Sequence, residues 1–217
     1  IELATQRLKD GHWDRPKRSK FSWDEWMSVP DETDRQALQM LLGARDSWEY
    51  AYRAERQFVL PAGPAGETVL RTMCRTGRCK VRTHPNDKDP KPVDFDDGPP
   101  WEFRLRVEPG NGAGQMTLTG RLTRDDQSMD ITEPAVVLRG GLMIARGRVA
   151  RLNHAGAFDL LAMLREGRHI DVPKADAGAL VEELYRLPRP PAMELPDDLR
   201  MEERRPPIQP VLKVKAA

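Results

Sequence analysis

Arginine side chains recur at alternate positions in the middle of the chain, where they could bind phosphate groups. Arg104 and Arg106 are separated by one apolar residue and therefore share one face of an expected strand. Arg121 falls on the polar side of the next strand, and Arg146 and Arg148 are expected to share a face in a third. Because neighbouring strands stand about 4.8 Å apart, these arginines could form a ladder that reaches several phosphates of DNA.

Acidic residues near the same strands offer a simpler role for the ladder. Glu102, Asp125 and Asp130 could pair with the arginines, or the arginines could solvate one face of a sheet. On the sequence alone we prefer this structural role and keep DNA binding as the alternative. A second basic run, at 15–20, stands among aromatic residues, a combination that single-strand-binding surfaces use. We prefer to interpret the run as a solvated connector beside rings that anchor an N-terminal arm, and keep contact with phosphate as the alternative.

The two cysteines, Cys74 and Cys79, stand in the segment CRTGRC. A gap of this length can close a disulfide around a turn. A zinc site needs four ligands, and of the other candidate ligands only His84 is close in sequence. In a reducing cytoplasm such cysteines are usually free, so we expect reduced structural thiols, with a disulfide or a metal site as open alternatives.

No spacing of residues in the chain amounts to a catalytic motif. His154 with Asp159, and His169 with Asp171, could form acid–base pairs, but each histidine stands at an element boundary without a nucleophile. We therefore expect these histidines to cap an element or to lie on the surface. The glycines of LPAGPAGE are not followed by the lysine and hydroxyl residue of a phosphate-binding loop. No catalytic, cofactor-binding or metal-binding residue is predicted.

The arginine ladder depends on a β-meander that we expect over 101–152. The apolar residues of WEFRLRV alternate with polar ones, which is typical of a half-buried strand. The turn PGNGAG and the segment QMTLTGRLTRD then complete a hairpin. Gly140 and Gly141 permit a turn or bulge before LMIARGRVARL, which we expect to be a strand.

Amphipathic helices are expected on both sides of the meander. The first follows Asp31 or Thr33 as its cap and carries an apolar stripe of Leu38, Leu41 and Leu42. The others are expected over 67–77, over 153–167 with Asn153 as a cap, and over 174–187. Short strands are expected at RCKVR, at RHIDVP and, as an edge strand, at VLKVK. The predicted class is α+β, with an antiparallel meander, flanking helices and a smaller helix-containing N-terminal part.

The segment 84–100 is rich in proline, aspartate and glycine and has almost nothing to bury. We therefore predict an N-terminal helical or mixed subdomain over 1–90, a linker or loop over 91–100, and the meander with its helices and an extended C-terminal exit over 101–217.

The composition is that of a globular protein with many charged residues. Among 217 residues, 35 are Lys or Arg and 34 are Asp or Glu, so the overall field does not drive nucleic-acid binding, which would need a locally basic face. No apolar run is long enough to span a membrane, and no signal peptide begins the sequence. Because Ile1 stands in place of Met, we expect the sequence to be a piece of a longer protein.

Several segments, taken in order, resemble one region of a known family. They are DRQALQMLLGARD, CRTGRCKVR, WEFRLRV, GRLTRDDQSMDITEP, VVLRGGLMIARGRVARLNHAGAFDLLAMLREG, HIDVP and LYRLPRPPAMELPDDLRMEERRPPIQPVLKV. From about residue 31 to the end, the chain is similar to the region upstream of the motor in bacterial helicase-like ATPases of the Swi/Snf class.

The resemblance implies a part of a DNA-dependent, ATP-hydrolysing translocase of the DEAD/DEAH-box superfamily. Such proteins often carry a zinc-binding SWIM module near the N-terminus, but this sequence has neither its cysteine–histidine spacing nor the motor's phosphate-binding lysine and acidic motifs. The motor, with ATP and Mg²⁺, is therefore expected downstream, and no catalytic residue carries over.

We expect a non-catalytic accessory domain in the bacterial cytoplasm that positions or regulates this motor. Its expected partners are the motor domain of the same polypeptide and, as an open possibility, DNA, but no membrane. The alternative is a protein–protein interaction module without nucleic-acid contact, which would use its leucine-rich helices and the VLKVK strand. A small enzyme whose site assembles only in three dimensions is a third possibility.

Overall fold

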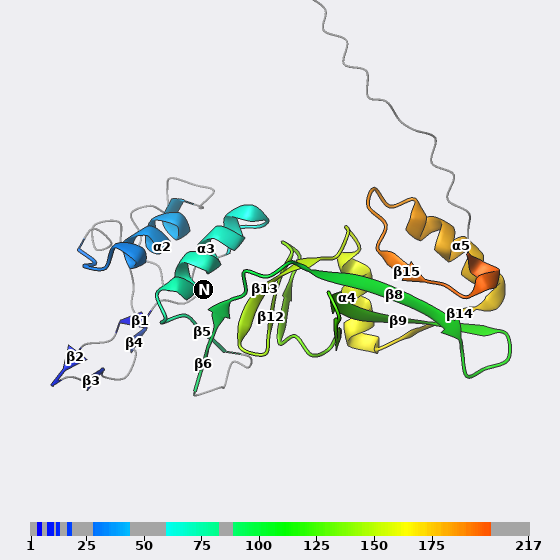
Figure 1. The fold of residues 1–217 in the computed structure, drawn as a ribbon, viewed down its shortest axis with the longest axis horizontal. Coiled ribbons are helices and arrows are strands. Elements are labelled where there is room, and N and C mark those ends of the chain that lie inside the picture. The colour runs from blue at the N-terminus through cyan, green and yellow to red at the C-terminus, as the bar shows by residue number, and fades with distance from the viewer. Residues whose placement is uncertain are drawn as a thin grey trace, which may run out of the picture.

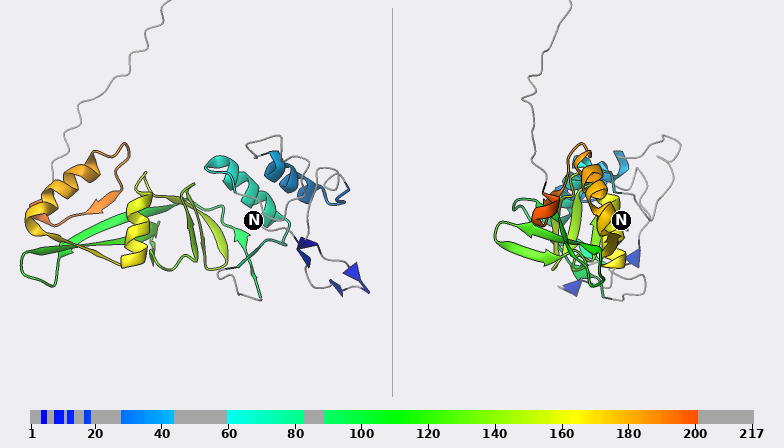
Figure 2. Two further views of the ribbon diagram at one scale, coloured as in Figure 1. Left: turned by 180° about the vertical axis from the view of Figure 1, so that it is seen from behind. Right: turned by 90° about the vertical axis from the view of Figure 1, so that its right-hand side faces the viewer.

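The fold is known from a computed structural model, which describes residues 4–5, 8–10, 12–13, 17–18, 28–43, 60–82 and 89–200. It confirms the expected α+β class, with a mixed, largely antiparallel sheet and flanking helices. The molecule is elongated: α2 (Glu32–Gly43) and α3 (Pro64–Arg75) lie at one end, α5 (Lys174–Tyr185) lies at the other, and the sheet lies between them (Figure 1). The two further views show that the molecule is narrow when it is seen along its long axis (Figure 2).

Two long antiparallel strands form the spine of the sheet. They are β8 (Trp101–Pro109) and β9 (Gln115–Arg124), which pair along almost their whole length. The glycine-rich turn at 110–114 joins them, as the sequence predicts. Alternate side chains of β8, from Trp101 to Val107, are buried, so the predicted hairpin and its two-residue period are confirmed.

Shorter strands flank this spine. β10 and β14 pair antiparallel with β9, whereas β13 and β15 pair parallel with β8. β13 also pairs with β12 and β7, and β12 pairs with β11. The bounds are β7 (Asp94–Phe95), β10 (Gln127–Asp130), β11 (Val136–Leu138), β12 (Leu142–Ala145), β13 (Arg148–Asn153), β14 (Ile170–Pro173) and β15 (Ala192–Glu194).

Three separate two-stranded pairs and one 3₁₀ turn complete the described elements. The pairs join β1 to β4, β2 to β3 and β5 to β6. The bounds are β1 (Ala4–Thr5), β2 (Leu8–Lys9), β3 (His12–Trp13), β4 (Lys17–Arg18), β5 (Lys80–Val81), β6 (Lys91–Pro92) and η2 (Asp197–Leu199). The predicted VLKVK strand, the side chain of Leu42 and most of the basic run at 15–20 lie outside the described residues.

Helices α4 (Phe158–Gly167) and α5 cover one face of the sheet. Leu161 of α4 is fully buried in one cluster with Phe103 of β8. Val181 of α5 is buried in an adjoining cluster with Val107, further along the same strand. This face contains the main core, because both clusters lie on it. Burial of each such side chain contributes about 1.5–3 kcal/mol.

Helix α3 covers only part of the opposite face. Leu70 and Cys74 of α3 pack with Val93, Leu142 and Val149 in a third cluster, over strands β7, β12 and β13. Over β8 and β9, by contrast, no helix in the described ranges covers this face, and its side chains are polar. The uncovered part is the face on which the sequence places Arg104 and Arg106.

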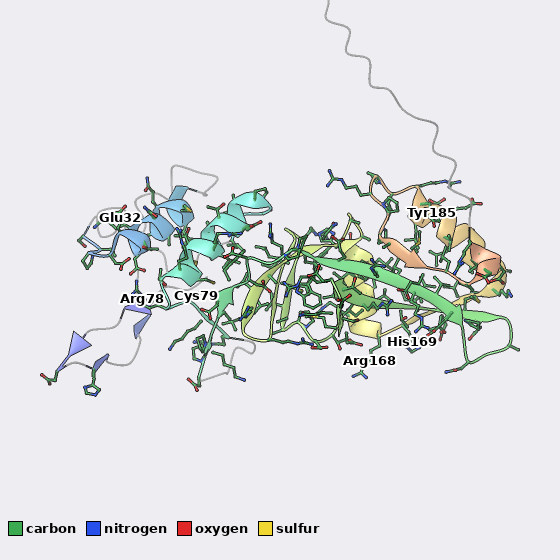
Figure 3. The ribbon with its side chains drawn as sticks, in the orientation of Figure 1. Glu32, Arg78, Cys79, Arg168, His169 and Tyr185 are labelled. Carbon is green, nitrogen blue, oxygen red and sulfur yellow. The ribbon has the colours of Figure 1, made fainter. Side chains whose placement is uncertain are left out.

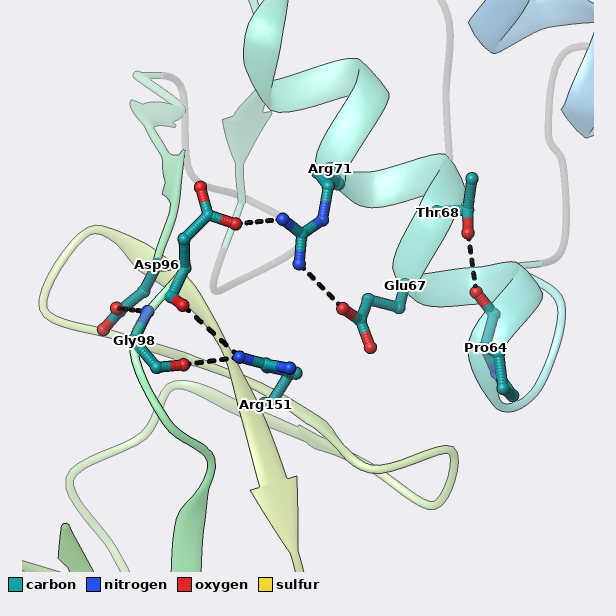
Figure 4. A network of polar contacts seen from close by, with 8 residues as sticks. Pro64, Glu67, Thr68, Arg71, Asp96, Gly98 and Arg151 are labelled. Carbon is teal, nitrogen blue, oxygen red and sulfur yellow. Dashed lines mark hydrogen bonds and ion pairs between the residues drawn. The ribbon is translucent and has the colours of Figure 1, made fainter.

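Polar contacts fasten α3 to the segment 96–98 and to the sheet. Arg71 of α3 forms ion pairs with Glu67, at 2.8 Å, and with Asp97. Arg151 of β13 donates hydrogen bonds to the main-chain oxygens of Asp97 at 3.3 Å and Gly98 at 2.7 Å. Figure 4 shows this network, in which one short segment connects the helix to β13.

The segment expected to be a linker is partly strand. Val93 is only 3% exposed, and Asp94 and Phe95 pair with β13, so the expectation that this stretch has almost nothing to bury is wrong. Val93 directly follows the exposed Lys91 and Pro92 and precedes the exposed Asp94, and these polar or proline neighbours mask its burial in the sequence. The division of the chain into subdomains at 91–100 stays a prediction.

Two local expectations are also wrong. The strand predicted over LMIARGRVARL is divided by a tight turn in which Arg146 and Gly147 both have positive φ, 51° and 74°. Such turns usually carry Asn-Gly or Asp-Gly, so Arg-Gly gives little indication of one. Asn153 does not cap α4, because its side-chain oxygen accepts a hydrogen bond from the Ala155 N–H at 3.0 Å and the helix begins only at Phe158.

Gly120 of β9 is required by close packing, and its substitution tests the main core. A Cβ atom at this position would lie 2.9 Å from Cε2 of Phe103 and 3.1 Å from Cδ1 of Ile131, both of which are buried. We expect Gly120→Ala to lower the free energy of unfolding by about 1–3 kcal/mol, measured by urea denaturation. Gly167→Ala is the matched control: nothing lies within 4 Å of the added atom, so stability stays equal or rises. Equal stability of the two variants would contradict this packing.

Candidate nucleic-acid interface

Three of the five predicted arginines lie together on the uncovered side of β8 and β9. Arg104 and Arg106 project from β8, and Arg121 of β9 is directly opposite Arg104 in the strand register. Strand β15 continues the row, because Glu194 is the register partner of Arg106. We call this surface the arginine face; its members are Glu102, Arg104, Arg106, Glu108, Arg121 and Glu194.

The arginines of this face differ in their partners. Arg121 forms an ion pair with Glu194, and Nε of Arg106 lies 3.3 Å from the Glu108 carboxylate. Arg104 is exposed and makes no ion pair or hydrogen bond within the described part of the chain. The paired side chains are between 36% and 55% exposed, and such pairs contribute only about 0–1 kcal/mol each. Arg106 and Arg121 can therefore exchange their partners at little cost.

The charges of the arginine face balance. Against its three arginines stand Glu102, Glu108 and Glu194, and Glu102 also accepts a hydrogen bond from the Asn153 amide at 2.8 Å. The face therefore combines guanidinium groups with carboxylates and is not a uniformly positive surface. The sequence indicated Glu102, Asp125 and Asp130 as partners, but Arg106 and Arg121 pair with Glu108 and Glu194 instead. Glu194 comes from a strand that is adjacent only in the folded chain.

The other two predicted arginines do not join this face. Arg146 lies in the turn between β12 and β13, and not in a strand, and it pairs with Glu133 at 2.7 Å. Arg148 begins β13, and strand alternation places it on the side of Ala150 and Leu152, which is the side that α4 covers. The predicted five-arginine ladder is therefore reduced to three members.

A groove borders the arginine face at the C-terminal end of β8. Its volume is about 680 Å³, and it lies between the last residues of β8 and the segment 193–200. Arg106 and Glu194 belong both to the groove and to the arginine face, and Tyr185 of α5 and Arg200 line its other side. Figure 3 shows Tyr185 on α5, on the side of the molecule opposite to α3.

The histidines have structural partners. Nε2 of His154 is 3.0 Å from the main-chain oxygen of Arg139, and its ring meets Phe158 edge to face with centroids 5.5 Å apart. Asp159 pairs with Arg139 instead, and the hydrogen bond from that guanidinium lowers the pKa of the Asp159 carboxyl. His169 faces Asp171 at 3.5 Å on an exposed edge of the sheet (Figure 3). His169 is therefore exposed, whereas His154 is half-buried and contacts a main-chain oxygen 15 positions away in the chain.

Cys74 and Cys79 are free thiols in the structure. Among the described residues, no group of three or more His, Cys, Asp or Glu side chains could hold a metal ion. The described helices include none that is long and apolar enough to cross a membrane.

Comparison with models of protein families, with curated proteins and with solved structures finds no match for this chain. The resemblance to the Swi/Snf class therefore rests on the sequence segments given above, and the functional roles it implies are proposals.

Arg124 of β9 contrasts with the arginines of this face, because it points to the covered side. Its guanidinium lies 2.7 Å from the Asp96 carboxylate and 4.7 Å from the centre of the Trp101 ring. The two charged side chains are only 16% and 11% exposed. Burial raises the pKa of Asp96, but the hydrogen bonds from Arg124 and from the Gly98 N–H outweigh it, so this pKa lies below its ordinary value.

This lowered pKa predicts a pH-dependent contribution to stability. A carboxyl whose folded pKa is depressed stabilises the fold above its unfolded pKa, about 3.9, and this contribution is lost as the pH falls through the folded value. We expect Asp96→Asn to be less stable than the parent at pH 7, with a difference that shrinks below about pH 4 in urea denaturation. Asp197→Asn, at a side chain that is 92% exposed, is the control and changes stability by less than about 0.5 kcal/mol. A difference for Asp96→Asn that is independent of pH would contradict the assignment.

Proposed function

We propose that this chain is a non-catalytic accessory domain of a Swi/Snf-class DNA-translocating ATPase, and that it contacts DNA through the arginine face. The observation that carries the DNA contact is the position of Arg104, Arg106 and Arg121 side by side on a sheet surface that no described helix covers. The resemblance of the sequence segments supports the link to the motor. ATP and Mg²⁺ belong to the downstream motor in this proposal.

Phosphate contacts by this face begin at Arg104. This guanidinium is exposed and has no acidic partner among the described residues, so it can bind a phosphate oxygen without breaking an ion pair of that part of the chain. Arg106 follows, because its exposed pair with Glu108 contributes little. The partly exposed side chains of Thr119 and Thr123, on the same face of β9, add hydroxyl donors.

The balanced charge of the face predicts weak binding by the isolated chain. Each carboxylate repels an approaching phosphate. The salt dependence of DNA binding therefore reports only the arginines that contact a phosphate. A weak contact is sufficient for an accessory domain, because attachment to a motor on the same polypeptide raises its effective concentration near DNA. In this proposal, the partners of the chain are the motor domain and DNA, and the complex works in the cytoplasm of a bacterium.

A protein–protein interaction module is the second candidate. The charge balance of the arginine face and the groove beside it favour this reading, since a protein surface with mixed charge fits both features. The two candidates differ in their affinity for DNA. A phosphate-binding face binds DNA at low salt and loses this affinity as salt is added, whereas the interaction module has no affinity for DNA.

Charge reversal on the arginine face tests the proposed function. We expect the parent to bind duplex DNA weakly at 50 mM salt, and Arg104→Glu/Arg106→Glu to lose about tenfold or more of that affinity. The slope of log affinity against log salt should become shallower by about 2, because two phosphate contacts are lost. Arg75→Glu/Arg168→Glu is the matched control: it changes the net charge equally at two exposed arginines, one in the last turn of α3 and one directly after α4. Equal binding by both double variants, or no binding by the parent, would remove the DNA contact and favour the interaction module.

Neutralising Glu194, the ion-pair partner of Arg121, gives a second test, in which the affinity for DNA is expected to rise. Glu194→Gln removes one negative charge from the arginine face and releases Arg121 from its ion pair. We expect the affinity for DNA at 50 mM salt to rise about threefold to tenfold, measured by fluorescence anisotropy. Glu166→Gln, an exposed change on α4 behind the sheet, is the control for net charge. An equal effect of both substitutions would show that Glu194 does not limit the face.

A further inference from the structure

Cys74 and Cys79 lie beside each other at the point where α3 meets the sheet. Cys74 stands in the last turn of α3 and is 5% exposed, and Cys79 is partly buried in the same apolar cluster. Between them the chain reverses at Gly77, where φ is 66° and the N–H donates to the Cys74 oxygen at 2.9 Å. Figure 3 shows Cys79 at the base of α3, far from Tyr185 at the other end of the molecule.

The two thiols differ in acidity. The neighbouring Cys74 lowers the pKa of the Cys79 thiol, although burial acts against it, whereas the neighbouring Cys79 and burial raise the pKa of the Cys74 thiol. Cys79 is therefore the more acidic of the two thiols, and it is also the more exposed. A thiolate that water and small molecules can reach is the nucleophile of cysteine oxidation, and a second thiol within contact can resolve the product.

We propose that Cys74 and Cys79 are a redox-sensitive modification site that forms a reversible intramolecular disulfide with a peroxide. The Cys79 thiolate attacks one peroxide oxygen, the O–O bond breaks, and the leaving hydroxide takes up a proton to become water. The Cys74 thiolate, after transfer of its proton, then attacks the resulting sulfenic acid, the S–O bond breaks, and a second water leaves. Both sulfurs are oxidised together by two electrons, and the peroxide is reduced to two waters.

The position of the pair gives this chemistry a structural effect. The main-chain oxygen of Cys79 accepts a hydrogen bond from the Val93 N–H at 3.0 Å, and Val93 leads directly into β7, which pairs with β13. A covalent bond from Cys79 to Cys74 therefore fastens the last turn of α3 to the chain that enters the sheet. Because α3 is otherwise held by apolar contacts and exposed polar ones, oxidation reduces the freedom of α3 to separate from the sheet.

Mass spectrometry of the 217-residue chain after treatment with hydrogen peroxide tests this inference. We expect a monomer that is about 2 Da lighter than the reduced parent, has no thiol that iodoacetamide can alkylate, and regains both thiols in dithiothreitol. Hydrogen exchange over 64–75 should be slower in the oxidised monomer than in the reduced one. A parent that keeps two alkylatable thiols, forms only intermolecular disulfides, or passes to sulfinic acid at Cys79 would overturn the proposal.

Single substitutions separate the roles of the two sulfurs. In Cys74→Ser, Cys79 keeps the reactive thiol, and we expect it to form a mixed disulfide with oxidised glutathione. In Cys79→Ser, the buried Cys74 should react at least tenfold more slowly, because the surrounding side chains shield it from the reagent. Circular dichroism confirms that each variant is folded before the comparison. Equal reactivity of the two folded variants would contradict the assignment of Cys79 as the nucleophile.

Discussion

Burial of one side of β8 is the constraint on which the rest of the structure depends. Trp101, Phe103, Leu105 and Val107 are between 0% and 4% exposed, and they extend across two adjoining apolar clusters. Helices α4 and α5 take their places on the sheet because they cover these side chains. The pleat then directs the intervening residues of β8 to the opposite side, so the arginine face is a consequence of the core behind it.

The sequence predicted the parts of the fold that local patterns determine. Alternation in β8 and the glycines at 110–114 were sufficient for the hairpin, and the apolar spacing located α3, α4 and α5 to within a few residues. The pairing of β15 with β8 could not be predicted, because a three-residue strand has no periodicity and its partner lies far away in the chain. Part of the error in the candidate site has the same origin, because Glu194 reaches Arg121 across 73 positions. Arg146 and Arg148 were misplaced for a local reason, since Arg-Gly gives little indication of the turn that divides β12 from β13.

Apolar clusters and exposed polar contacts stabilise both ends of the sheet. At the α5 end, the ion pair of Lys174 with Asp198 lies beside one cluster, and at the α3 end Arg71, Arg151 and the segment 96–98 supplement another (Figure 4). Exposed ion pairs and main-chain hydrogen bonds contribute less per contact than buried apolar area. At the α3 end, the proposed bond between Cys74 and Cys79 would add a covalent connection to these non-covalent contacts.

The late position of β15 in the chain has a consequence for the order of folding. The β8–β9 hairpin closes through a short turn. Pairing of β15 with β8 closes a much longer loop, which contains the intervening strands and two helices, and therefore costs more loop entropy. Until that step, Arg121 has no carboxylate from Glu194 beside it. A β8–β9 hairpin without β15 would thus be more electropositive on this surface than the finished molecule, and docking of the last strand adds the carboxylate of Glu194.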